Sequence, residues 1–190
     1  MPRLFTGIEI PEDLKDELGA LDAPLPGVRW VAVDDLHLTL RFAGDIDNRT
    51  ADEFAHFLSD IKMEPFELEF SELGTFGGKD PKVIYAGLKP SPPLERLQRA
   101  HDTAARSAGL PPEGKPFKPH VTLARLKYCR ADALARYLGH RGGYRSKPFP
   151  VDQFVLFSAK PGGGGGPYIV EAEYPLGPQF KGAWAEGDEL

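Results

Sequence analysis

Two tetrapeptides of the same kind, HLTL at His37–Leu40 and HVTL at His120–Leu123, constrain the fold of this chain more than any other feature. The apolar, strand-favouring residues in and around them predict two strands with His and Thr on one face and aliphatic side chains on the other. A single such motif would be weak evidence, because half-buried strands often carry a polar face. Two copies, each followed by a polar break and a helical pattern, indicate a diverged internal duplication.

The size and cysteine content narrow the class of protein. A chain of 190 residues with 41% hydrophobic content can bury a core, as one domain or as two closely packed lobes. The one cysteine, Cys129, excludes an internal disulfide and a four-cysteine zinc cluster. The acidic N-terminal segment lacks the apolar core of a signal peptide, and no stretch approaches the ~20 apolar residues of a membrane span. We therefore expect a cytoplasmic protein without membrane contact.

Charge is unevenly distributed along the chain. The net charge of −5 argues against a protein that coats long nucleic acids. The segment from Arg96 to Lys147 nevertheless holds twelve Lys and Arg and only three acidic residues, and it contains the second HxT motif. Some of these cations, such as Arg136 and Arg141, fit ordinary solvated positions. The segment as a whole is expected to attract a phosphate-bearing ligand.

The remaining patterns predict alternating strands and helices. Strands are predicted at 3–9, 28–33, 66–76, 82–88, 151–159 and 168–176, in addition to the two HxT strands. Helices are predicted at 11–21, 50–63, 93–108 and 131–138, with a capping box at Thr50 and Glu53 and a stop at Gly139. Hairpin-length connections favour an α+β fold with mainly antiparallel sheets over a doubly wound parallel sheet.

Three further features receive structural interpretations. His101 falls on the apolar side of its predicted helix, so we expect a packed, hydrogen-bonded histidine. Trp30 is assigned to the core. The run Gly162–Gly166 is followed by Pro167 and a strand, whereas a phosphate-binding loop needs Lys-Ser or Lys-Thr and a helix, so the run predicts a flexible connector or lid.

The HxT strands suggest acid and base chemistry if they face each other across a cleft. An unperturbed histidine titrates around 6.5, so near neutral pH one imidazole can be protonated while the other is neutral. Thr39 and Thr122 lie two residues beyond His37 and His120, point to the same faces and offer hydroxyl groups that suit phosphate oxygens.

Three nearby side chains are candidates to assist. Strict alternation puts Arg41 on the His37 face, whereas Arg125, five positions after His120, reaches the site only if its strand bends. Phe42 needs a similar bend to stack on a base. Metal chemistry is disfavoured, because neither HxH nor HExxH occurs and no carboxylate shares the strand face. Cys129 has no placed base and a GxSxG motif is absent, so water is the expected nucleophile.

With their flanks, RWVAVDDLHLTLRFAG (Arg29–Gly44) and PFKPHVTLAR (Pro116–Arg125), the two motifs resemble the two-histidine phosphoesterase superfamily. The resemblance is strongest to its RNA 2′,3′-cyclic phosphodiesterases, the LigT/ThpR-like proteins of the 2′-5′ RNA ligase family, and covers nearly the whole chain. It implies one bilobal α+β domain over residues 1–190. Two pseudo-twofold-related, mainly antiparallel sheets flanked by helices would each give one HxT strand to a central groove.

The resemblance also implies an activity: hydrolysis of RNA or nucleotide 2′,3′-cyclic phosphates to 2′-phosphates, without metal or other cofactor. His37 would protonate the departing 3′ oxygen, and His120 would accept the proton of the attacking water. Thr39, Thr122 and Arg125 would bind the phosphate. The partners would be RNA ends or small nucleotides with a 2′,3′-cyclic phosphate, and duplicated halves could complete the site within a monomer.

Two alternatives remain at this point. The same acid and base pair could run the reverse reaction and join a 2′,3′-cyclic end to a 5′-hydroxyl through a 2′-5′ link. The groove could also serve a non-catalytic module that binds phosphates or RNA ends.

Overall fold

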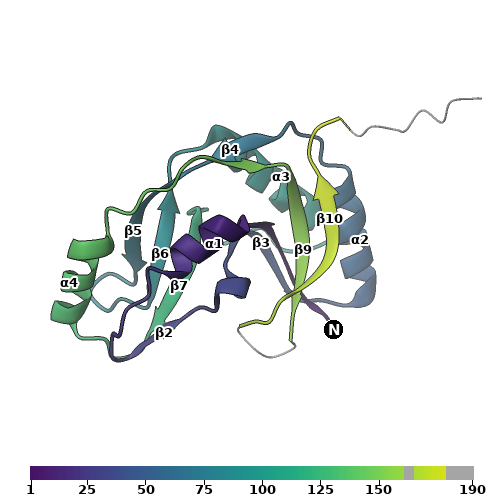
Figure 1. Ribbon diagram of the computed structural model, residues 1–190. Coiled ribbons are helices and arrows are strands. Elements are labelled where there is room, and N and C mark those ends of the chain that lie inside the picture. Colours follow the sequence, from purple (N-terminus) through teal and green to yellow (C-terminus); the bar gives the residue numbers. More distant parts are fainter. Residues whose placement is uncertain (161–164, 179–190) are drawn as a thin grey trace, which may run out of the picture.

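The computed structural model describes residues 1–160 and 165–178 (Figure 1). Residues 162–164 of the predicted glycine connector lie outside this range, so that prediction stays untested. The helices are α1 (Glu12–Gly19), α2 (Asn48–Ser59), α3 (Pro92–Ser107) and α4 (Ala131–Arg141), with a 3₁₀ turn, η1 (Val33–Asp35). None of the described helices has the length and apolar character needed to span a bilayer.

The strands form one large and one small antiparallel sheet. They are β1 (Arg3–Glu9), β2 (Val28–Trp30), β3 (His37–Asp45), β4 (Phe66–Leu68), β5 (Phe70–Phe76), β6 (Val83–Leu88), β7 (His120–Leu126), β8 (Phe149–Val151), β9 (Gln153–Ala159) and β10 (Ile169–Pro175). The eight-stranded sheet has the order β10-β9-β1-β3-β7-β6-β5, with β2 also paired to β7, and β4 pairs with β8. The predicted α+β class with antiparallel sheets is confirmed.

The large sheet consists of two halves that meet at their HxT strands. The first half is β10-β9-β1-β3 and the second is β2, β7, β6 and β5. Only the pair Leu38 and Val121 joins β3 to β7, so the two predicted sheets are the halves of one sheet. The unit β1-α1-β3 corresponds to β6-α3-β7, and β9 pairs with β1 as β5 pairs with β6. This correspondence is the internal duplication expected from the paired motifs.

The connecting helices cross over to the opposite half. Helix α3 packs on the first half, where the His101 ring lies 4.4 Å from that of Phe154 on β9. Helix α1 lies beside the segment after α4, because Tyr144 donates a hydrogen bond to Glu17 and Lys147 forms an ion pair with Asp13. Figure 1 shows α1 on the near side of the sheet and α3 behind it. The exchange binds the two halves into a common apolar core.

Several predicted boundaries are wrong for local reasons. Helix α4 continues through Gly139 to Arg141, because a single glycine only weakens a helix whose Leu134 and Tyr137 are buried. Helix α2 begins at Asn48, because the Asp47 side chain accepts the Thr50 amide and caps the helix before the predicted capping box. The predicted strand 66–76 is divided into β4 and β5, which belong to different sheets.

Candidate active site

A groove of about 390 Å³ lies where β3 meets β7, a size typical of small-ligand sites. Both HxT motifs face it. Its lining is Arg3, Phe5, Arg29, Trp30, Val31, Ala32, Asp35, His37, Thr39, Phe42, His120, Thr122, Arg125, Ala159, Gly165, Gly166 and Tyr168. Six of the seven residues singled out from the sequence are brought together here, and Arg41 is the exception.

The same backbone irregularity follows both HxT motifs. In the β1–β3 pair the register passes from Thr39 opposite Gly7 to Arg41 opposite Thr6, so Leu40 is an extra residue. In the β6–β7 pair it passes from Thr122 opposite Tyr85 to Ala124 opposite Ile84, which leaves one extra residue at the equivalent position. An extra residue of this kind is a β-bulge, and it reverses the alternation of side chains beyond it.

The bulges decide which side chains reach the groove. Phe42 and Arg125 each lie five positions after a histidine, and each faces the groove beside the His and Thr of its own strand. The residues just before them, Arg41 and Ala124, are buried on the opposite face. Phe42 and Arg125 are therefore equivalent positions in the two halves, although strict alternation would place both away from the site.

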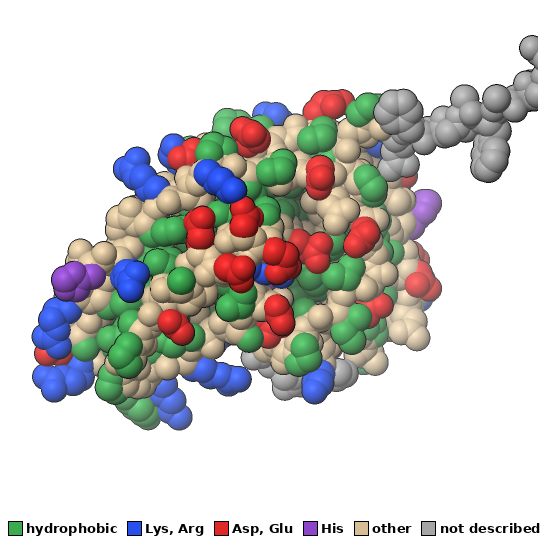
Figure 2. Space-filling view, viewed as in Figure 1, with side chains coloured by type: hydrophobic (Ala, Val, Ile, Leu, Met, Phe, Trp, Pro, Cys, Tyr) green, Lys and Arg blue, Asp and Glu red, His purple; other side chains and the backbone are tan. Residues whose placement is uncertain are grey.

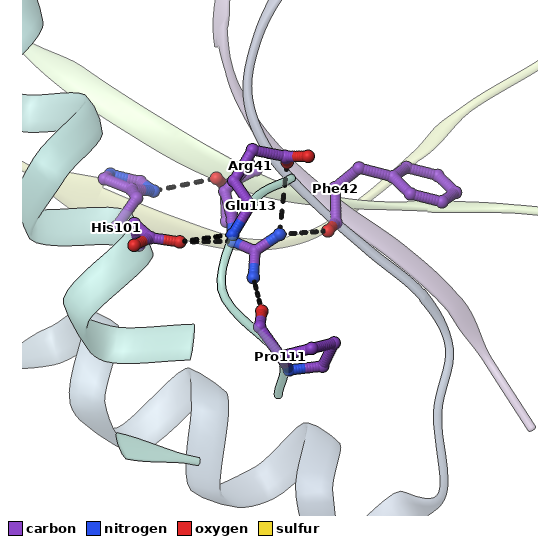
Figure 3. A network of polar contacts seen from close by, with 7 residues as sticks. Arg41, Phe42, His101, Pro111 and Glu113 are labelled. Carbon is purple, nitrogen blue, oxygen red and sulfur yellow. Dashed lines mark hydrogen bonds and ion pairs between the residues drawn. The ribbon is translucent and has the colours of Figure 1, made fainter. Parts of the chain in front are cut away.

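The expected placement of Arg41 on the His37 face is wrong, because the bulge at Leu40 turns the side chain away. Arg41 is only 5% exposed and donates hydrogen bonds to Glu113 Oε2 (3.2 Å) and to the carbonyl oxygens of Phe42 and Pro111. Its Nε atom lies 3.2 Å from Asp102 Oδ1 in an ion pair, without the alignment of a hydrogen bond. Figure 3 shows the Arg41 guanidinium and the Phe42 ring pointing to different sides of the strand.

Arg41 instead joins β3 to the chain that leads to the second motif. Asp102 belongs to α3, and Glu113 and Pro111 belong to the loop between α3 and β7. The Phe42 carbonyl is the one partner on β3 itself among the contacts described. The strand that carries His37 is thereby fixed to the connection that delivers His120. The alternation of side chains along the strand did not predict this role, because no residue pattern in the sequence marks the β-bulge at Leu40.

His37 is held by a backbone carbonyl and an aromatic wall. Its Nδ1 atom lies 2.7 Å from the carbonyl oxygen of Asp35, and its Nε2 atom lies 3.0 Å from Thr39 Oγ1. A carbonyl can only accept, so Nδ1 carries a proton and Nε2 is the atom that titrates. The ring centres of Phe5 and Tyr168 lie 5.0 Å from the His37 ring. The imidazole is thus oriented with Nε2 beside the Thr39 hydroxyl.

His120 is held in the corresponding way. Its Nδ1 atom lies 2.5 Å from the carbonyl oxygen of Lys118, two residues earlier, which again makes Nε2 the titrating atom. The rings of Phe76 and Tyr85 lie 4.8 and 5.7 Å from it. Thr122, on the same face, is free of the hydrogen bond that Thr39 makes to its histidine, among the contacts that the structure describes.

The charged neighbours of the two histidines differ. Burial lowers the pKa of His37, while the Asp35 carbonyl and carboxylate act to raise it. Burial likewise lowers the pKa of His120, the Lys118 carbonyl raises it, and the positive charge of Arg125 lowers it further. Asp35 therefore favours a protonated His37, and Arg125 favours a neutral His120.

The other histidine and tryptophan predictions have mixed outcomes. His101 is fully buried, with Nδ1 2.7 Å from Thr6 Oγ1, so its interpretation as a packed, hydrogen-bonded residue is confirmed. Burial lowers the pKa of His101 to about 3. Trp30 packs against the core and donates a hydrogen bond to the Ala23 carbonyl at 2.9 Å, but it also contributes to the groove wall.

Several lining residues were not identified from the sequence. Asp35 belongs to the turn η1 before β3, where strand alternation does not apply, and it adds a carboxylate to the groove that the pattern of the strand did not predict. Arg29 could have been found only through its pairing with Arg125 across β2 and β7. Tyr168 reaches the groove from a segment far along the chain, and no local pattern marks that approach. Within residues 1–160 and 165–178, no three His, Cys, Asp or Glu side chains are arranged to hold a metal ion.

Comparison with known proteins gives consistent results. Residues 10–163 match the model of the 2′-5′ RNA ligase superfamily. The chain is 30% identical over 162 residues to an RNA 2′,3′-cyclic phosphodiesterase of Bacillus subtilis, covering 82% of this chain and 87% of the relative. It is 31% identical over 179 residues to one of Aquifex aeolicus, covering 89% and 90%. The crystal structure of Escherichia coli LigT with 3′-AMP has the same fold, with a TM-score of 0.74, 24% identity, and coverage of 93% and 99%.

Proposed function

This chain belongs to the 2′-5′ RNA ligase superfamily of two-histidine phosphoesterases, and we propose that it hydrolyses RNA or nucleotide 2′,3′-cyclic phosphates to 2′-phosphates without a metal ion. One observation carries the proposal. Two histidines on equivalent strands line one groove, and each has its Nδ1 proton fixed on a carbonyl two residues earlier. Both titrating Nε2 atoms are then available for proton transfer.

The environments of the two histidines support different roles for them. The base must be neutral before the reaction, and the neighbouring Arg125 favours a neutral His120. The acid must be protonated, and Asp35 favours a protonated His37 against the effect of burial. An anionic phosphate in the groove would act with Asp35 to raise the pKa of the nearby His37 against the effect of burial.

The bonds change in one displacement at phosphorus. His120 Nε2 accepts a proton from water as the water oxygen bonds to phosphorus, and the bond from phosphorus to the 3′ oxygen breaks. His37 Nε2–H gives its proton to that oxygen, so the products are a 2′-phosphate and a 3′-hydroxyl. Proton exchange with solvent returns both rings to their starting states.

The remaining groove residues stabilise the phosphate. Arg125 neutralises charge as phosphorus becomes five-coordinate, and the Thr122 hydroxyl donates to a non-bridging oxygen. Thr39 acts in the same way after releasing its hydrogen bond to His37. Phe42 is 45% exposed at the groove edge, where its ring can stack on the base of the terminal nucleotide. Arg41 has no part in substrate binding.

The test is turnover of a 2′,3′-cyclic mononucleotide in excess EDTA, with the position of the product phosphate identified by chromatography. We expect conversion to the 2′-phosphate, lowered ~10²- to 10⁴-fold in His37→Ala and in His120→Ala. His140→Ala, at an exposed histidine, is the matched control and should keep full activity. Binding of a 2′-phosphorylated nucleotide without any turnover would favour the non-catalytic module instead.

Ligation is the second candidate, because a 5′-hydroxyl can replace water in the same displacement. The family model that matches this chain is described by that reaction. Adding RNA with a 5′-hydroxyl to the same assay separates the two. A 2′-5′-linked product that exceeds the hydrolysis product would make ligation the principal activity.

A further inference from the structure

The turn between β7 and α4 carries an exposed aromatic residue in a strained conformation. Tyr128 has φ 63°, in the left-handed region that disfavours bulky side chains, and it is 89% exposed. Packing of the ring cannot explain this conformation, because the ring is in solvent. Backbone strain of this kind concentrates at functional sites, so the position of Tyr128 relative to the groove matters.

The backbone around Tyr128 is held by close packing. The Lys127 amide donates a hydrogen bond to the Gly27 carbonyl at 2.7 Å, and Gly27 has φ 76°. A Cβ atom on Gly27 would lie 2.2 Å from the Lys127 carbonyl oxygen. Glycine thus permits β2 and its preceding loop to approach this turn closely. The turn that presents Tyr128 is therefore fixed by tertiary contacts as well as by its own sequence.

The turn continues the cationic side of the groove. Beyond the bulge, Arg125 is exposed and lines the groove, Leu126 is buried, and Lys127 is exposed in the bend that directly follows β7. Arg29 pairs with Arg125 on β2 and also lines the groove. Among the described residues, no carboxylate lies within ion-pair distance of any of these three cations.

Tyr128 lies at the end of this row of cations. The Lys127 ammonium group lies 5.6 Å from the centre of the Tyr128 ring. Three strand residues span about 10 Å, so the ring is about that far along the chain from Arg125. In Figures 1 and 2, Lys and Arg side chains gather along the lower left, around β2, α4 and the turn from β7, whereas acidic side chains gather over α1.

We propose that the Lys127–Tyr128 turn is a binding platform for the RNA chain that precedes the cyclic phosphate. An exposed aromatic ring with unpaired cations beside it is the arrangement with which proteins stack single-stranded bases and follow their phosphates. The terminal nucleotide occupies the groove with its cyclic phosphate at Arg125, a preceding phosphate lies against Lys127, and a preceding base stacks on Tyr128. The inference rests on the proposed function and specifies its substrate as an RNA chain.

The experiment compares two substrates that end in the same 2′,3′-cyclic nucleotide, a mononucleotide and a short single-stranded oligoribonucleotide. Wild type should have a higher kcat/KM on the oligonucleotide. Tyr128→Gly removes the ring and suits the positive φ, so the variant should fold at least as stably as wild type. We expect it to lose about tenfold in kcat/KM on the oligonucleotide and nothing on the mononucleotide. Tyr128→Phe should keep the wild-type preference.

Salt dependence tests the cationic part of the platform. Lys127→Ala should flatten the log-log dependence of the oligonucleotide KM on salt by about 0.7, the value for one phosphate contact on a single strand. Lys62→Ala, at an exposed lysine between α2 and β4, is the matched control and should leave the slope unchanged.

The outcomes separate this inference from the proposed function. Equal kcat/KM on both substrates in wild type, or unchanged oligonucleotide kinetics in Tyr128→Gly, would overturn the platform while mononucleotide turnover upholds the activity. Equal losses on both substrates would make Tyr128 a structural residue and would also overturn it. Absence of turnover on both substrates would refute the activity and the platform together.

Discussion

The two halves of the sheet share a backbone device but differ in the chemistry that it presents. In each half a His and a Thr are followed by a bulge, and the fifth residue after the His returns to the groove. That residue is Phe42 in the first half and Arg125 in the second. The equivalent position is thus aromatic in one half and cationic in the other, which suits a substrate with a base at one end and a phosphate at the other.

The difference extends to the histidines. Burial lowers the pKa of both histidines; at His37 the Asp35 carboxylate acts to raise the pKa while His120 and Lys15 lower it, whereas at His120 the charge of Arg125 only lowers it. The two imidazoles occupy equivalent positions in the duplicated halves, but their neighbours make their environments different. The comparison leads to five predictions, the largest of which separates the two histidines.

We expect His120→Gln and His37→Gln each to lower kcat/KM ~10²- to 10⁴-fold and to remove opposite limbs of the pH profile. In wild type, kcat/KM should rise as His120 loses its proton and fall as His37 loses its own. Because burial lowers both pKa values from 6.5, the maximum should lie on the acidic side of 6.5. His120→Gln should lack the rising limb and His37→Gln the falling one, in kcat/KM measured from pH 4.5 to 8. The same profile in both variants would make the two histidines equivalent.

Replacing the cationic side of the groove should have the next largest effect. Arg125→Ala should lower kcat about 10²- to 10³-fold, because the charge that develops at phosphorus loses the guanidinium that neutralises it. Arg125→Lys should recover part of the loss. Steady-state kinetics on a cyclic mononucleotide measure kcat and KM of both variants. Arg145→Ala, at an exposed arginine outside the groove lining, is the control and should leave both constants unchanged. If Arg125→Ala raised only KM, Arg125 would bind the ground state alone.

The sequence was sufficient for the motifs and the fold class but not for the side on which residues beyond the motifs lie. Apolar alternation identified the strands that carry His37 and His120, and it placed Thr39 and Thr122 correctly, since all four precede the bulges. A bulge adds one residue and reverses every side chain after it, so the same rule placed Arg41 wrongly. Tyr168 joins the site through tertiary packing, which no local pattern encodes.

The polar contacts of Arg41 with α3 and the loop after it occur only in the first half of the sheet, and they should account for part of the stability of the fold. Arg41→Leu removes the buried partner of Asp102 and Glu113, whose carboxylates are themselves partly exposed, and we expect the free energy of unfolding in urea to fall by about 2 kcal/mol, less than for a fully buried pair. The residue equivalent to Arg41 in the second half is Ala124, whose buried methyl group cannot form such contacts. Arg49→Leu removes an exposed ion pair to Glu53 and should cost less than about 1 kcal/mol. Similar losses in both variants would show that burial of Arg41 adds nothing.

The first half also buries a titratable group, which predicts acid sensitivity. His101 has a pKa of about 3 in the folded protein against about 6.5 when unfolded, so the unfolded state binds more protons between these values. Its contribution to stability is complete above pH 6.5 and is lost as the pH falls, by about 1.4 kcal/mol per pH unit. His101 should therefore account for about 2 kcal/mol of the difference in unfolding free energy, measured in urea, between pH 6.5 and 5, in addition to the shares of His37 and His120. His101→Phe should remove most of the His101 share, whereas His140→Ala should keep it.

The smallest expected effect tests the aromatic side of the comparison. The Arg3 guanidinium lies 5.2 Å from the Phe42 ring centre and pairs with Asp45, and Arg3 and the half-exposed Phe42 ring both line the groove. If the ring stacks on the terminal base, Phe42→Ala should raise KM for a cyclic mononucleotide about tenfold and leave kcat within twofold, since stacking precedes and survives the displacement. Phe42→Trp should restore KM. A fall in kcat at constant KM would instead mean that Phe42 positions the reacting phosphate, and the two sides of the groove would then share one task.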